Sequence, residues 1–162
     1  MSQSTKDIYS YCLDLLSRKA YSSFKLKQKL KEKQFIENEI EAVLKLLAAE
    51  RYLRDDLYAE SRARTWMAKG DSKSQIRRRL KHEKLSLTSE RIEELYSETN
   101  RSEEIQVRKL IDLQFRKLRS LPRDPDAIFK LKKKITASVM RKGHSFQIVK
   151  TELERKMKEA IT

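Results

Sequence analysis

Apolar residues return along this chain every three or four positions, which is the period of an α-helix with one buried face. One such stripe predicts a helix over about residues 37–51, and its members are Ile40, Val43, Leu44 and Leu47. A second stripe predicts another helix from about residue 55, and it consists of Ala59, Ala63, Trp66 and Met67. The pattern therefore predicts a chain of amphipathic helices.

Start and stop signals divide these helices in the middle of the chain. The Asp55 carboxylate can cap the second helix by accepting from its unpaired N–H groups, and Gly70 can adopt the left-handed conformation that ends it. Ser72 and Gln75 have the S-x-x-Q spacing of a capping box. A new basic helix is therefore expected directly after the glycine.

Further signals of the same kind follow towards the C-terminus. Thr88 and Ser102 can each cap a helix, and Asp124 precedes a proline at the first helical position. Gly143 can end the helix that Asp124 begins. Only two glycines and two prolines occur in 162 residues. Because a sheet protein of this length needs many tight turns, this scarcity also favours an all-helical chain.

The apolar pattern repeats. Leu26 and Leu30 match Ile76 and Leu80 fifty residues further on. A third copy keeps the spacing with Ile135, Val139, Val149 and Leu153. Such a repeat is typical of stacked units that cannot bury their apolar faces alone. We therefore predict an all-α fold, an elongated array of three tandem three-helix repeats at residues 1–53, 54–100 and 101–162.

The charge is strongly positive, with a formal net charge of +14. An excess of this size indicates a polyanionic partner, although a charged stretch is also compatible with a merely solvated helix face. The candidate partner-binding residues are the cations of the second predicted helix in each repeat, including two at the end of the helix that Asp124 begins. They are Lys25, Lys27, Lys29, Lys31, Arg77, Arg78, Arg79, Lys81, Lys130, Lys132, Lys133, Lys134, Arg141 and Lys142.

The sequence offers little for catalysis or cofactor binding. His82 and His144 lie far apart, and the single cysteine, Cys12, falls on an apolar stripe, so no spaced metal set is present. No glycine-rich phosphate loop occurs. We therefore expect a protein that is not an enzyme, has no cofactor, and keeps Cys12 in its core. Without a signal peptide or an apolar stretch of membrane length, we expect a cytoplasmic protein with no membrane contact.

Three stretches resemble the bacterial RecX family, whose members modulate the RecA recombinase. They are YSSFKLKQKL at residues 21–30, ERYLRDDLYA at 50–59 and KGDSKSQIRRRLKHEKL at 69–85. Two positions depart from the family pattern. Gln34 stands where glycine is usual, and Gly70 is followed by Asp71 instead of a small residue.

The resemblance implies a monomeric regulator that binds RecA in its nucleoprotein filament on single-stranded DNA. Such a protein would inhibit the RecA ATPase and strand exchange, and so restrain homologous recombination, DNA repair and the SOS response. Weak direct contact with DNA is a further expectation. The charge alone leaves an alternative open, a direct nucleic-acid-binding protein that contacts phosphates through its basic helices without reading sequence.

Overall fold

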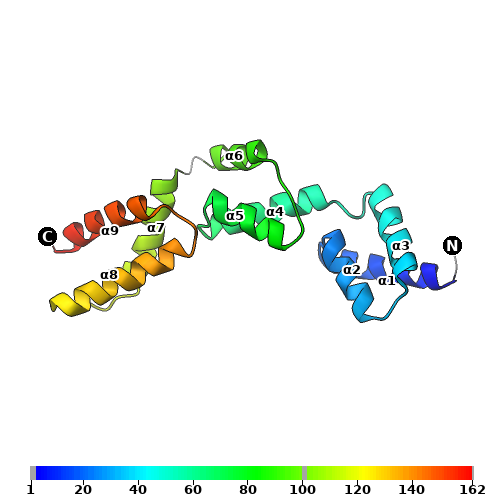
Figure 1. The fold of residues 1–162 in the computed structure, drawn as a ribbon, viewed down its shortest axis with the longest axis horizontal. Coiled ribbons are helices and arrows are strands. Elements are labelled where there is room, and N and C mark those ends of the chain that lie inside the picture. Colours follow the sequence, from blue (N-terminus) through cyan, green and yellow to red (C-terminus); the bar gives the residue numbers. More distant parts are fainter. Residues whose placement is uncertain (1–2, 100–101, 162) are drawn as a thin grey trace. The chain divides into compact units, whose positions relative to one another are not determined.

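The structure is a computed structural model that describes residues 3–99 and 102–161, and within these ranges it contains helices and no strands (Figure 1). The predicted all-α array of three-helix repeats is confirmed. The helices are α1 (Gln3–Arg18), α2 (Ser23–Glu32), α3 (Glu37–Ala49), α4 (Asp55–Ala68), α5 (Lys73–His82), α6 (Ser89–Ser97), α7 (Glu103–Phe115), α8 (Pro125–Met140) and α9 (Phe146–Ile161).

The chain folds into two compact units. Unit 1 comprises residues 1–62 and 80–87, and unit 2 comprises residues 63–79 and 88–162. Helices α4 and α5 each contribute residues to both units. The repeat boundaries at residues 53 and 100 were inferred from sequence periodicity and stay a prediction.

Unit 1 has its core between α1, α2 and α3. The buried side chains include the predicted apolar positions of α2 and α3: Leu26, Leu30, Ile40, Val43 and Leu47. Cys12 lies among them with no exposed surface, as its place on an apolar stripe predicts. Burial raises the pKa of its thiol to about 11. Cys12 is therefore a small core side chain that stays in the unreactive thiol form.

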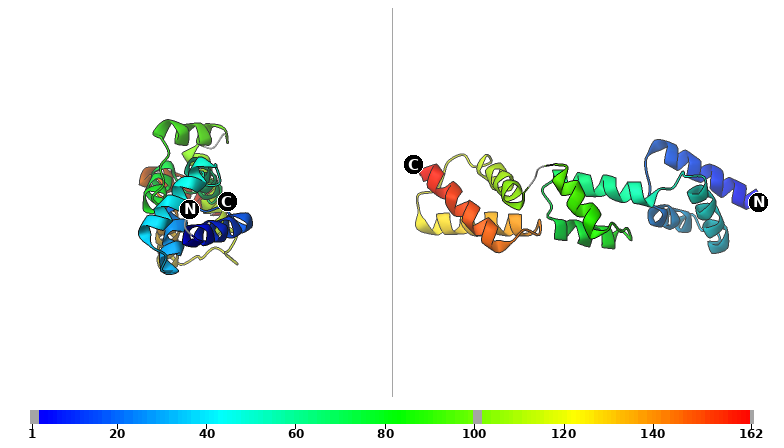
Figure 2. Two further views of the ribbon diagram at one scale, coloured as in Figure 1. Left: turned by 90° about the vertical axis from the view of Figure 1, so that its right-hand side faces the viewer. Right: turned by 90° about the horizontal axis from the view of Figure 1, so that it is seen from above.

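Unit 2 has a second core between α7, α8 and α9. Its buried residues are Val107, Ile111, Ile135, Val139, Val149, Leu153 and Met157. Helices α8 and α9 run antiparallel beside each other after the short turn at Gly143 (Figures 1 and 2). Trp66 of α4 is 4% exposed, so it packs in the interior of unit 2.

The helix caps predicted at Thr88, Ser102 and Asp124 are present, and Ser22 forms a fourth. The side-chain oxygens of Ser22, Thr88, Ser102 and Asp124 each accept a hydrogen bond from the backbone N–H three residues further on. Each of these bonds satisfies one of the N–H groups that a helix leaves unpaired at its start. Local sequence was therefore enough to place these four helix starts.

Two predicted features of helix starts need correction. Asp55 does not cap its own helix, because it is the first residue of α4 and its carboxylate accepts from the Ser23 N–H at 2.8 Å. The box at Ser72 is only half formed. Ser72 Oγ accepts from the Gln75 N–H at 3.2 Å, but the Gln75 side chain accepts from Arg78 and the Ser72 N–H donates to the Lys142 carbonyl.

Both glycines end helices in the left-handed conformation, with φ of +81° at Gly70 and +82° at Gly143. Gln34 and Lys84 also have positive φ, 62° and 55°. They follow α2 and α5 and lie fifty residues apart, which is the sequence repeat. The backbone repeats its geometry at these two positions even though neither residue is glycine.

Candidate functional site

The cations of α2 are largely used inside unit 1. Lys27 contacts Glu37 at 2.7 Å and Glu41 at 3.0 Å, and Lys31 contacts Glu37 at 2.9 Å. Hydrogen bonds from Lys27 and Lys31 hold the pKa of Glu37 below its usual range. Two of the four α2 lysines are therefore compensated by acids of α3, and on α2 only Lys29 makes no ion pair with a described residue.

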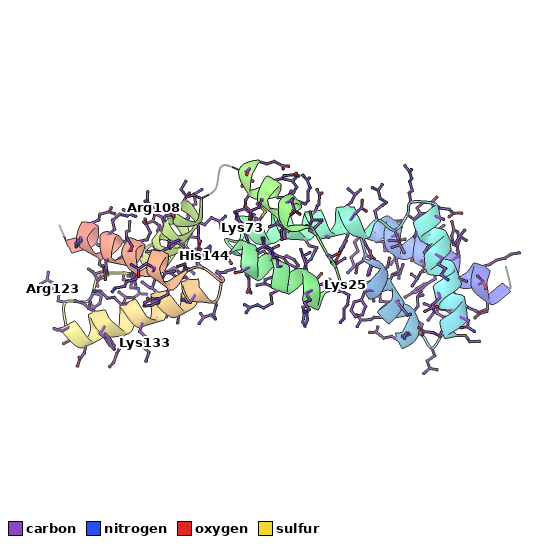
Figure 3. All side chains as sticks on the ribbon, turned by 45° about the horizontal axis from the view of Figure 1, so that its top comes forward. Lys25, Lys73, Arg108, Arg123, Lys133 and His144 are labelled. Carbon is purple, nitrogen blue, oxygen red and sulfur yellow. The ribbon has the colours of Figure 1, made fainter. Side chains whose placement is uncertain are left out.

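Lys25 belongs to a cluster centred on the half-buried Glu83 (Figure 3). The Glu83 carboxylate contacts Lys25 and Arg62, each at 2.7 Å. Burial alone would raise the pKa of Glu83, but the hydrogen bonds from Arg62 and Lys25 outweigh it and hold the pKa below its usual value. Lys25 also contacts the Tyr58 hydroxyl at 3.3 Å. These contacts give Lys25 a structural role in unit 1.

Some of the α5 cations form ion pairs and others do not. Arg79 contacts the Asp71 carboxylate at 2.7 Å and lies over the Trp66 ring, 5.7 Å from its centroid. Arg77 is 3.8 Å from Glu93, a loose contact at a solvent-exposed position. Arg78 and Lys81 are exposed and form no ion pair among residues 3–99 and 102–161.

Asp71 is the residue that the sequence interpretation missed. Its side chain is 1% exposed and contacts both Arg79 at 2.7 Å and Lys142 Nζ at 2.8 Å. Its backbone carbonyl accepts from the buried Tyr96 hydroxyl. A carboxylate directly after a left-handed glycine was the available signal. Lys142 and Arg79, both predicted partner-binding residues, thus neutralise a buried acid inside unit 2.

His144 is a buried structural residue. It is 3% exposed, and one ring nitrogen, Nε2, lies 2.8 Å from the Gly70 carbonyl (Figure 3). The other, Nδ1, lies 3.3 Å from Glu103. Together with the Ser72–Lys142 backbone hydrogen bond, these contacts fasten the turn before α9 to the turn before α5. Among the residues that the structure describes, no three His, Cys, Asp or Glu side chains are grouped to hold a metal.

The open positive charge lies mainly on α8. Lys130, Lys133 and Lys134 are exposed, Lys132 is half-buried, and none of them forms an ion pair with a described residue. Exposed Arg141, directly after α8, is equally unpaired within those residues. Lys133 projects from α8 at the surface of unit 2 (Figure 3). Unlike α2, the surface of α8 can offer its charge to a partner.

These features describe a protein of tandem three-helix units with a basic surface. The matching family model is described as RecX, first three-helix domain, and it covers residues 9–47. The regulatory protein RecX of Haemophilus influenzae strain 86-028NP is 34% identical over 91 residues, 56% of this chain and 59% of the relative. That of Vibrio campbellii is 35% identical over 74 residues, 46% of this chain and 48% of the relative. The chain is thus similar to RecX proteins, through the model of their first three-helix domain and through these partial matches.

The matched segments span about half the length of these relatives. Two solved structures share the fold. A crystal structure of RecX from Lactobacillus salivarius has a TM-score of 0.68 at 22% identity, covering 96% of this chain and 97% of that chain. A crystal structure of regulatory protein RecX also gives 0.68, at 23% identity, covering 91% and 72%. In the described part of the chain, no helix has the length and apolar character needed to cross a membrane.

Proposed function

We propose that this protein binds the RecA filament on single-stranded DNA and restrains RecA, slowing ATP hydrolysis and strand exchange and so limiting recombination and SOS induction. Its similarity to relatives that are named regulatory protein RecX supports this. The observation that carries the proposal is the unpaired lysine set on α8, within a chain of net charge +14.

The lysines suit a nucleoprotein better than a small ligand. A lysine ammonium is a compact point charge on a flexible stem, and it contacts phosphates or acidic side chains without reading base identity. Such contacts give affinity that falls as salt rises, because bound counterions are released from the polyanion. The paired lysines of α2 can contribute less, because acids of their own unit already satisfy them.

A direct nucleic-acid-binding protein is the second candidate, since unpaired lysines on α8 would serve a bare strand as well. The two functions differ in which partner is preferred. The filament regulator binds RecA-coated DNA more tightly than bare DNA and lowers ATP turnover. The direct binder holds both equally and leaves the turnover of each bound RecA unchanged.

The test is the RecA ATPase on saturating single-stranded DNA, with this protein added up to a one-to-one ratio with RecA. We expect turnover to fall in proportion to the protein added. A parallel titration of the same bare DNA should show weaker binding. An unchanged ATPase rate at equimolar protein would overturn the filament function, and equal affinity for both forms of DNA would favour direct binding.

A further inference from the structure

Helices α8 and α9 leave an apolar groove between them on the surface of unit 2. The groove has a volume of about 590 Å³, and Thr136, Ala137 and Leu153 are among the residues that line it. Phe129 and Phe146 also line it, yet they are 67% and 56% exposed. Single exposed apolar residues are normally scattered over a protein surface. Several of them around one groove usually mark an interaction site.

The groove is a part of the three-helix unit that α7 leaves uncovered. The core residues Ile135, Val139 and Val149 belong to the cluster that includes Val107 and Ile111 of α7. On α8, by contrast, Phe129, Thr136 and Ala137 follow at i, i+7 and i+8, which places them along one stripe facing the groove. Helices α8 and α9 therefore present a second apolar seam in addition to their core.

The length of this seam matches a helix. Helices α8 and α9 run antiparallel (Figures 1 and 2). Phe129 is near the start of α8 and Phe146 opens α9, so the two residues stand at opposite ends of the groove. Seven to eight helical residues separate Phe129 from Thr136 and Ala137, a rise of about 10–12 Å. A helix laid in the groove would fill it with apolar side chains at i, i+4 and i+7.

The rim of the groove is positive. Lys132, Lys133 and Lys150 line it and form no ion pair with any described residue, whereas Glu154 is its only lining acid. This charge selects an occupant with acidic flanks. It disfavours a second copy of the same surface, because two lysine rims would repel each other. Phe129 and Phe146 stand at opposite ends of the groove, so single-stranded nucleic acid would find no continuous run of aromatic faces on which successive bases could stack.

We propose that the α8–α9 groove binds an acidic amphipathic helix of a partner protein, with apolar anchors between Phe129 and Phe146 and carboxylates against Lys132, Lys133 and Lys150. The helix would complete a four-helix bundle with α7, α8 and α9. This proposal names a surface and the chemistry of its partner, and it does not rest on the filament-binding function.

The test uses the full chain and a fluorescent, hydrocarbon-stapled 16-residue helix with leucines on one face and glutamates on the other. Fluorescence anisotropy should show saturable binding. The variant Phe129→Ala/Phe146→Ala should weaken it at least about tenfold, since truncating aromatic anchors typically costs this much. Ile36→Ala/Leu57→Ala removes two comparably exposed apolar side chains from unit 1 and should leave binding unchanged.

A charge swap tests the rim separately. Lys132→Glu/Lys133→Glu should lose affinity for the glutamate helix and gain affinity for the same helix carrying lysines in place of glutamates. The proposal is overturned if the wild type fails to bind the glutamate helix, if a sequence-scrambled peptide binds equally well, or if the phenylalanine and control variants behave alike. Displacement of the peptide by a 16-nucleotide oligothymidine that itself depends on both phenylalanines would instead assign the groove to nucleic acid.

Discussion

Single residues decide how the turns of this protein close. Gln34 and Lys84 occupy equivalent positions after α2 and α5 and adopt the left-handed conformation, which strains a residue with a Cβ. At Asp71 the constraint is electrostatic, because a carboxylate that is 1% exposed meets two cations. The pattern of apolar positions predicts neither the positive φ of Gln34 and Lys84 nor the buried charge of Asp71.

Replacing Gln34 with glycine should stabilise the protein. The change relieves the left-handed strain of about 1–2 kcal/mol, but glycine also raises the conformational entropy of the unfolded chain. We therefore expect a net gain of roughly 0.5–1 kcal/mol in unfolding free energy. Urea unfolding followed by circular dichroism measures it. Gln28→Gly in the middle of α2 makes the same chemical change at a helical φ and should cost about 1 kcal/mol. A loss of stability at both positions would contradict the strain argument.

Asp71→Asn should destabilise unit 2. The change removes the charge between Arg79 and Lys142, and breaking a buried pair in this way typically costs about 2–3 kcal/mol. Trp66, the only tryptophan, reports on unit 2 through its fluorescence during urea unfolding. Asp126→Asn at the exposed start of α8 is the control and should cost less than about 1 kcal/mol. If both variants unfolded at the wild-type urea concentration, Asp71 would have no structural role.

At the scale of the helices, ion pairs decide which basic surface is open. Helices α2 and α8 are both lysine-rich. Lysines of α2 pair with Glu37 and Glu41 of α3, whereas the lysines of α8 pair with no acid among the described residues. Glu83 extends the same principle, because it joins Lys25 of α2 to Arg62 of α4. The paired cations fix helix packing, and the unpaired ones remain available.

Glu83 should make unit 1 sensitive to acid. Its pKa is lower in the folded protein than in the unfolded chain, so the ionised carboxylate stabilises the fold above the unfolded value of about 4.3. That contribution is lost as the pH falls through the lowered folded pKa. Glu83→Gln should therefore lower stability at pH 7 by about 1–2 kcal/mol and flatten its decline below about pH 5.

Urea unfolding between pH 3 and 7, followed by circular dichroism, measures this dependence. Glu32→Gln, at an exposed position of α2 without an ion pair to a described residue, should keep the wild-type pH profile. A Glu83→Gln curve that runs parallel to the wild-type curve at every pH would show that the carboxylate does not titrate with folding.

At the scale of the whole molecule, local sequence patterns predicted the helices but not the contacts between residues that are distant in the sequence. The caps at Ser22, Thr88, Ser102 and Asp124 could be predicted because each donor lies three residues away. The role of Asp55 was predicted wrongly because its partner, Ser23, lies 32 residues earlier. The repeat spacing shows which segments are equivalent, but it does not predict which charged side chains form ion pairs with each other.

The candidate surface shows the same limit. The sequence predicted that basic second helices contact a partner, but it could not separate Lys27, held by two acids, from Lys130, which meets none among the described residues. Nor does a helical apolar pattern reveal that Phe129 and Phe146 stay exposed, because that depends on where α7 packs. The similarity to RecX proteins could be predicted because the motif positions are contiguous in the chain.

The most direct test of the account compares two matched lysine pairs in binding to the RecA–single-stranded DNA filament. Lys130→Ala/Lys134→Ala and Lys27→Ala/Lys31→Ala each remove two lysines spaced i, i+4, but only the second pair is neutralised by acids in the structure. Cosedimentation at several salt concentrations should show weaker binding for the α8 variant, with the log–log salt slope reduced by about 1.5. The α2 variant should bind as the wild type does. Equal losses in both variants, or a loss only in the α2 variant, would contradict the claim that unpaired charge on α8 carries the binding.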